Sequence, residues 1–119
     1  GFFSYASFFF VGEVDYDAEA LKALVARKRT AAETAGVFER LLEETLDPLL
    51  EWNAAGVEGA LRSFLEASGW SSKELFMPIR VAVTGRPATP PLFETMAVLG
   101  KEICRRRLRR AVNVLRAGA

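Results

Sequence analysis

The sequence predicts an all-α fold, a helical bundle of about six helices in one domain of 119 residues. Apolar residues recur at spacings of three and four through most of the chain. Capping patterns precede several of these runs, and glycine or proline follows them. No alternating run is long enough to require a strand, although Val81–Thr84 fits a strand and a short helix equally well.

The first half of the chain predicts three helices. Asp17 is a candidate N-cap for a helix that reaches about Arg29. Thr30 opens a capping box, and the helix after it is interrupted at Asp47-Pro48. A third helix ends at Ser68-Gly69. The apolar faces of the second and third helices consist of Phe38, Leu41, Leu42, Thr45 and Leu46, and of Val57, Leu61, Phe64 and Leu65.

The second half predicts shorter helical pieces joined by proline and glycine. Ser71 starts a second capping box, but Pro78 is expected to divide the segment after this box into a turn and a new helix. That helix should end at Gly85, which suits a left-handed C-cap. Thr89 is the expected N-cap of the next helix, with Pro90 at its first position.

Composition excludes several kinds of chemistry. The chain has no histidine and one cysteine, which excludes catalytic Ser-His-Asp and Cys-His sets, histidine-bound metals and an intrachain disulfide. A single cysteine fits a reducing, cytoplasmic compartment. The aromatic start GFFSYASFFFVGEVDYD has no basic region and is too short to span a bilayer, so we expect it to pack on the domain or on protein upstream.

Charge is distributed unevenly along the chain. Residues 1–70 carry six Lys/Arg and twelve Asp/Glu, whereas residues 71–119 carry ten and three. The last helix, expected from about Gly100 to Arg116, has an apolar stripe that includes Cys104, a core residue in our interpretation. Its arginine face either contacts phosphates or is a solvated face that complements the acidic half. The candidate phosphate contacts are Arg86, Lys101, Arg105 and Arg109.

The segment from Met77 to Lys101 is the most informative part of the chain. Arg80 lies among apolar residues, and an arginine with a packed stem can stack on a base or bond to its edge. A stiff loop then leads through Thr89-Pro90 to Leu92 and Phe93, which offer a hydroxyl, a rigid ring and apolar surface. Single-stranded RNA is recognised with such groups, but a tight connection between two helices explains the same residues.

The order of these residues resembles the end of bacterial-type glutamyl-tRNA synthetases. The matching motifs are PIRVAVTG (78–85), TPPLFE (89–94), LGKE (99–102) and RRLRRA (106–111). The resemblance implies that residues 1–119 are the C-terminal anticodon-binding domain, an all-helical cage. Residues 1–16 would then be a Phe-rich opening segment left from an upstream helical subdomain.

By this resemblance, Arg80 takes the place of an arginine that stacks on the anticodon. Thr89, Pro90, Leu92 and Phe93 take the places of residues around the first two anticodon bases. The implied partner is tRNA-Glu, with no DNA and no membrane, and the chain is expected to be a monomer. No cofactor is expected in this chain, whereas the full-length ligase uses ATP and Mg²⁺ in a catalytic domain whose signatures this sequence lacks.

Two alternatives remain open at the level of sequence. The chain could be a helical protein-interaction module that uses its acidic half or its Phe-rich start. It could also be a DNA-binding domain that uses the arginine helix.

Overall fold

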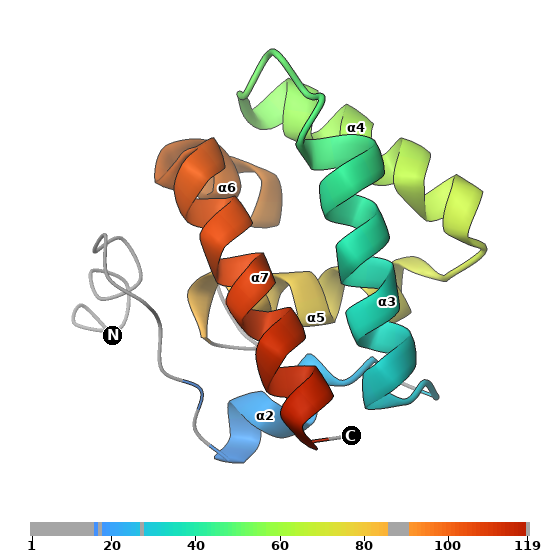
Figure 1. Ribbon diagram of the computed structural model, residues 1–119. Coiled ribbons are helices and arrows are strands. Elements are labelled where there is room, and N and C mark those ends of the chain that lie inside the picture. The colour runs from blue at the N-terminus through green and yellow to red at the C-terminus, as the bar shows by residue number, and fades with distance from the viewer. Residues whose placement is uncertain (1–15, 17, 27, 86–90, 119) are drawn as a thin grey trace.

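The computed structural model describes residues 16, 18–26, 28–85 and 91–118, and these ranges form helices and connections without a strand (Figure 1). The all-α prediction is therefore confirmed for the described part of the chain. The elements are α2 (Ala18–Leu24), α3 (Ala31–Leu41), the π-helical turn η1 (Leu42–Leu46), α4 (Ala54–Ser68), α5 (Ser72–Thr84), α6 (Leu92–Leu99) and α7 (Lys101–Gly118).

Helix α2 is shorter than predicted, because it ends at Leu24 and not at about Arg29. The backbone of Lys28 adopts the left-handed region, with φ of 63°, which a continuing helix does not allow. Beyond α2 the chain is fixed by other bonds: Ala26 N donates to Thr34 Oγ1 at 3.1 Å, and Arg29 N donates to Ala26 O at 3.0 Å. The predicted cap, Asp17, lies outside the described residues.

Both predicted capping boxes are confirmed. Thr30 and Glu33 exchange side-chain-to-backbone bonds at the start of α3, and Ser71 and Glu74 do the same at the start of α5. Each pair satisfies two backbone N–H groups that the first turn of a helix leaves without partners.

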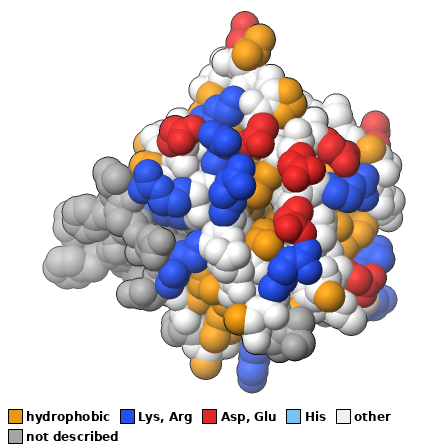
Figure 2. Space-filling model, viewed as in Figure 1, with side chains coloured by type: hydrophobic (Ala, Val, Ile, Leu, Met, Phe, Trp, Pro, Cys, Tyr) orange, Lys and Arg blue, Asp and Glu red, His pale blue; other side chains and the backbone are white. Residues whose placement is uncertain are grey.

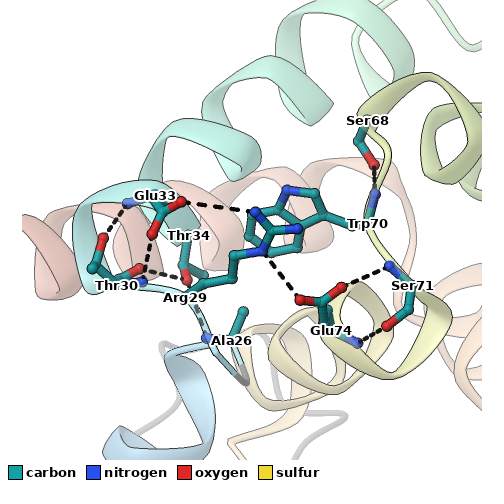
Figure 3. A network of polar contacts seen from close by, with 9 residues as sticks. All are labelled: Ala26, Arg29, Thr30, Glu33, Thr34, Ser68, Trp70, Ser71 and Glu74. Atoms are coloured by element: carbon teal, nitrogen blue, oxygen red, sulfur yellow. Dashed lines mark hydrogen bonds and ion pairs between the residues drawn. The ribbon is translucent and has the colours of Figure 1, made fainter.

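Arg29 connects the α2–α3 loop to the start of α5 (Figure 3). Its Nε donates to Glu74 Oε2 at 3.1 Å, and its guanidinium lies 4.6 Å from the centre of the Trp70 ring. The same glutamate accepts from the backbone of Ser71 in the capping box. Arg29 therefore links the start of α5 to the loop that follows α2.

Helix α5 runs through Pro78 without a break, so the predicted division at this proline is wrong. An interior proline removes one backbone hydrogen bond and costs about 3 kcal/mol. The helix also buries Leu75, Ile79, Val81 and Val83, and each fully buried side chain of this size contributes roughly 1.5–3 kcal/mol. Burial therefore outweighs the missing bond, and Val81–Thr84 is helical.

Helix α5 ends at Gly85 as predicted, α6 ends at Gly100, and the start of α6 differs from the prediction. Gly85 (φ 79°) and Gly100 (φ 92°) both have backbone angles that favour glycine, and Gly85 N donates to Val81 O at 2.7 Å. Helix α6 begins at Leu92 with Pro91 as its N-cap residue, two positions later than predicted. The predicted cap and first helical residue, Thr89 and Pro90, lie outside the described residues.

Helix α5 packs against α2 on one side and against α7 on the other, and α7 also packs along α3 (Figure 1). Helices α4 and α6 pack against each other. The faces predicted to be apolar on α3 and α4 lie in this core, which contains Phe38, Leu41, Leu42, Leu46, Val57, Leu61 and Phe64.

Replacement of Glu74 by glutamine tests the Ser71–Glu74–Arg29 corner. Hydrogen bonds from the Ser71 backbone, and then from its hydroxyl and Arg29, hold the pKa of Glu74 below its ordinary value despite some desolvation. A lowered folded pKa gives stability that is present above the ordinary pKa and lost as pH falls through the folded value. Glu74→Gln should therefore melt below the wild type at pH 7, with a difference that disappears in acid.

The measurement is the melting temperature between pH 7 and pH 3. Glu66→Gln is the matched control, because the Glu66 side chain is exposed on α4 and forms no ion pair or hydrogen bond with any described residue. A Glu74→Gln deficit of constant size over the whole pH range would contradict the assigned role.

Candidate nucleic-acid interface

A pocket of about 580 Å³ lies between α2 and the first two-thirds of α5. Among the described residues, three cationic side chains line it and no carboxylate does, so this part of the lining favours an anionic or electron-rich ligand. Phe76, Met77 and Pro78 give it an apolar wall. The described lining residues are Lys22, Ala23, Val25, Ser72, Lys73, Phe76, Met77, Pro78 and Arg80.

Arg80 lies in the second half of α5 and is half-buried at this pocket. Its Nε is buried and has no hydrogen-bond partner among the described residues. A buried donor without a partner costs about 1–3 kcal/mol, so the folded protein carries an arginine whose bonding capacity is not used internally.

Phe93, a predicted site residue near the start of α6, contacts Phe76 of the same pocket. The rings of Phe93 and Phe76 meet edge to face, with centroids 5.7 Å apart and planes at 88°. The guanidinium of Arg62 lies over the Phe93 ring, 5.5 Å from its centroid. Leu92, by contrast, is 3% exposed and belongs to the core, so the apolar surface expected of it from the sequence is wrong. Arg86, Thr89 and Pro90 lie outside the described residues.

Most cations of α7 are engaged within the fold. Lys101 Nζ donates to Asp47 O at 2.8 Å and to Leu49 O at 2.9 Å, at the carboxyl end of η1. Arg105 pairs with Asp47 at 2.7 Å and with Glu102 at 2.6 Å. These hydrogen bonds, Glu102 first and then Asp47, raise the pKa of Arg105.

Arg109 is the most exposed of the predicted phosphate contacts that the structure describes. It is 58% exposed, against 27% for Arg105, and its nearest carboxylate oxygen, on Asp47, is 3.8 Å away. Arg116 pairs with Glu39 on α3. Figure 2 shows this arrangement as a run of basic side chains along α7 with acidic side chains beside it, over α3.

Arg107 is a residue that the sequence interpretation missed. It is 1% exposed, and its Nη1 donates to Val83 O at 2.7 Å near the carboxyl end of α5. Burial lowers its pKa. A signal was present in the spacing, since Arg107 lies three residues after Cys104 and four before Ala111, both on the apolar stripe.

Nothing in the described ranges adds a catalytic or metal site. Cys104 is fully buried, and burial raises the pKa of its thiol to about 12, which confirms it as a core residue. Among the described residues no group of three or more Asp, Glu or Cys could hold a metal ion. No described helix is both long and apolar enough to cross a membrane.

Comparison with known proteins shows the family of this chain. A family model described as an anticodon binding domain matches residues 2–112. The glutamate–tRNA ligase of Acidothermus cellulolyticus is 38% identical over 94 residues, which are 78% of this chain and 19% of that protein. The glutamate–tRNA ligase of Roseiflexus castenholzii is 39% identical over 110 residues, which are 92% of this chain and 21% of that protein.

A solved structure also matches the fold of this chain. The crystal structure of a glutamate tRNA ligase from Elizabethkingia meningosepticum, in complex with its amino acid, matches with a TM-score of 0.77 and 26% identity over 92% of this chain and 20% of that one. The chain belongs to the anticodon-binding domain family, and tRNA is the class of ligand that this family implies. It spans about a fifth of the length of the relatives it matches.

Replacement of Arg80 by methionine tests whether its buried Nε is a cost to the free protein. Methionine keeps the length of the stem and removes the buried donor. Arg80→Met should raise the free energy of unfolding by about 1 kcal/mol, as measured by urea titration. Arg40→Met is the control, since exposed Arg40 pairs with Glu44, and should change stability by no more than about 0.5 kcal/mol. A clear loss of stability in Arg80→Met would show that Nε has a partner in the folded protein.

Proposed function

We propose that residues 1–119 are the C-terminal anticodon-binding domain of a glutamyl-tRNA synthetase and bind tRNA-Glu. The observation that supports this most directly is the family match over residues 2–112, together with relatives that are glutamate–tRNA ligases. In this proposal residues 1–16 continue from an upstream helical subdomain. Tyr16, at the end of that segment, donates to Ala82 O at 2.8 Å on α5.

Arg80 is the central base-reading residue of the proposed site. Its half-buried position, its lack of an internal partner at Nε and its place on a cationic pocket suit stacking on, or hydrogen bonding to, an unstacked base. Phe93 contributes the aromatic surface that adjoins the pocket through Phe76. Thr89 and Pro90 would contact the first two anticodon bases, and Leu92 would support the corner from the core.

In the parent enzyme this domain would bind and position the tRNA. ATP-dependent attachment of glutamate, with Mg²⁺, would take place in a catalytic domain outside these residues. We place that enzyme in the cytoplasm and expect this domain to act as a monomer. The ion pairs of α7 with Glu39 on α3 and with Asp47 after η1 disfavour a DNA-binding role for the arginine helix. Arg109 is the most exposed of the predicted phosphate contacts that the structure describes.

Anticodon dependence is the direct test of this function. The 119-residue chain should bind unmodified tRNA-Glu more tightly than a tRNA-Glu whose first two anticodon bases are substituted, because unstacked bases carry the specific contacts. Fluorescence titration of both RNAs in low salt measures the ratio of the two dissociation constants. Equal affinities, or no binding of either RNA, would contradict anticodon recognition by this chain.

Single substitutions distinguish recognition of the anticodon bases from electrostatic contact with the phosphates. Arg80→Ala should weaken binding of tRNA-Glu by roughly 1–3 kcal/mol through loss of stacking and should reduce the anticodon preference. Arg109→Ala, the matched removal of an exposed arginine, should lower the salt dependence and leave the preference unchanged. Wild-type binding by Arg80→Ala, with loss of preference in Arg109→Ala, would reverse these roles.

A further inference from the structure

We propose that the groove between α2 and the start of α5 holds the sugar–phosphate backbone of single-stranded RNA beside the base at Arg80. Lys22, Lys28 and Lys73 would be its phosphate contacts. The inference rests on the proposed function of Arg80 and adds residues that neither the sequence patterns nor the comparisons assign to a site.

The first support is the state of these three lysines. All three are exposed, and none forms an ion pair within the described ranges. Lys101 and Arg105 of α7 differ, since they are held by carbonyl or carboxylate oxygens at 2.6–2.9 Å. Unpaired ammonium groups remain free to neutralise phosphates.

The second support is the shape of the surface. A further hollow of about 510 Å³ is lined by Lys28, Ser71, Lys73 and Glu74. It shares Lys73 with the Arg80 pocket, so the two hollows adjoin at this side chain. In the proposal the strand follows both hollows as one path. A single small anion would occupy only one part of this path, whereas consecutive phosphates would follow its length.

The one carboxylate that lines this path among the described residues is already neutralised. Glu74 accepts bonds from Ser71 and from Arg29, and these interactions lower its pKa. Between the lysines, Phe76 and the 39%-exposed Met77 offer apolar surface for a ribose or a base. Alternating cationic and apolar groups are what a single strand requires, because its phosphates and bases both need partners.

The test compares the salt dependence of RNA binding in lysine variants and in a matched control. The variants are Lys22→Ala, Lys73→Ala and Lys28→Asn, because asparagine tolerates the left-handed backbone at position 28. Arg40→Ala removes one exposed cation on α3 that lines neither hollow. The probe is a tRNA-Glu anticodon stem-loop, titrated at several salt concentrations.

Each lysine variant should reduce the slope of log affinity against log salt by about 0.7, the value expected for one single-strand phosphate contact. The ratio of affinities for the native and substituted anticodons should stay at the wild-type value. Arg40→Ala should leave both quantities unchanged. Inorganic phosphate and a poly-glutamate peptide, added at the same ionic strength, should not displace the RNA.

Several results would contradict the proposal that this groove binds the RNA backbone. Wild-type slopes in all three variants, with melting temperatures that show folded protein, exclude these lysines as phosphate contacts. Displacement by inorganic phosphate identifies a small-anion site, and displacement by poly-glutamate identifies an acidic-peptide site. Loss of slope in Arg40→Ala equal to that in the variants indicates a nonspecific charge effect.

The results distinguish failure of the proposed function from failure of the groove proposal. If Arg80→Ala loses anticodon preference while the lysine slopes stay at the wild-type value, only the groove is excluded. If the wild type shows no anticodon preference but the lysine slopes fall, base reading is excluded and the groove remains an RNA-backbone site.

Discussion

The arrangement of the molecule depends on α5 remaining one helix through Pro78. Phe76 and Arg80, on either side of this proline, both line the pocket, so a break there would separate the apolar wall from the arginine. Near its carboxyl end, Ala82 O accepts from Tyr16 and Val83 O accepts from Arg107. These carbonyls have no partner inside the helix, so bonds from Tyr16 and α7 complete α5. A buried arginine is thus explained by the orphan carbonyl that it satisfies.

The charge asymmetry of the sequence is explained mainly by packing between the two halves. Glu39 on α3 pairs with Arg116 of α7, and Asp47, which follows η1, lies within 4 Å of both Arg105 and Arg109. The alternative interpretation of the arginine helix, as a complement to the acidic half, accounts for these pairs. Among the described residues, the exposed basic side chains without such partners are Lys22 on α2, Lys28 on the loop after it, Lys73 at the start of α5 and Arg106 on α7. Lys22 and Lys73 line the pocket, and Lys28 lines the hollow beside it.

Local signals in the sequence predicted local structure, and long-range packing decided the rest. Thr30, Ser71 and Gly85 act through neighbours three or four residues away, so their patterns were sufficient for correct caps. Pro78 failed as a break because its cost is compared with burial against distant helices, which no local pattern records. Leu92 looked like surface for the same reason. Arg107 was missed because its partner, Val83 O, lies 24 residues away.

The apolar neighbours of Arg80 single it out in the sequence, but they do not predict that its Nε is buried without a hydrogen-bond partner. Its buried Nε has no partner among the described residues, a condition that normally destabilises a fold. The cost is tolerated because α5 is anchored at both ends, by the Ser71–Glu74–Arg29 corner and by the bonds of Tyr16 and Arg107. An arginine held in this way loses little side-chain freedom when a ligand arrives, so less of the interaction energy is spent on ordering it.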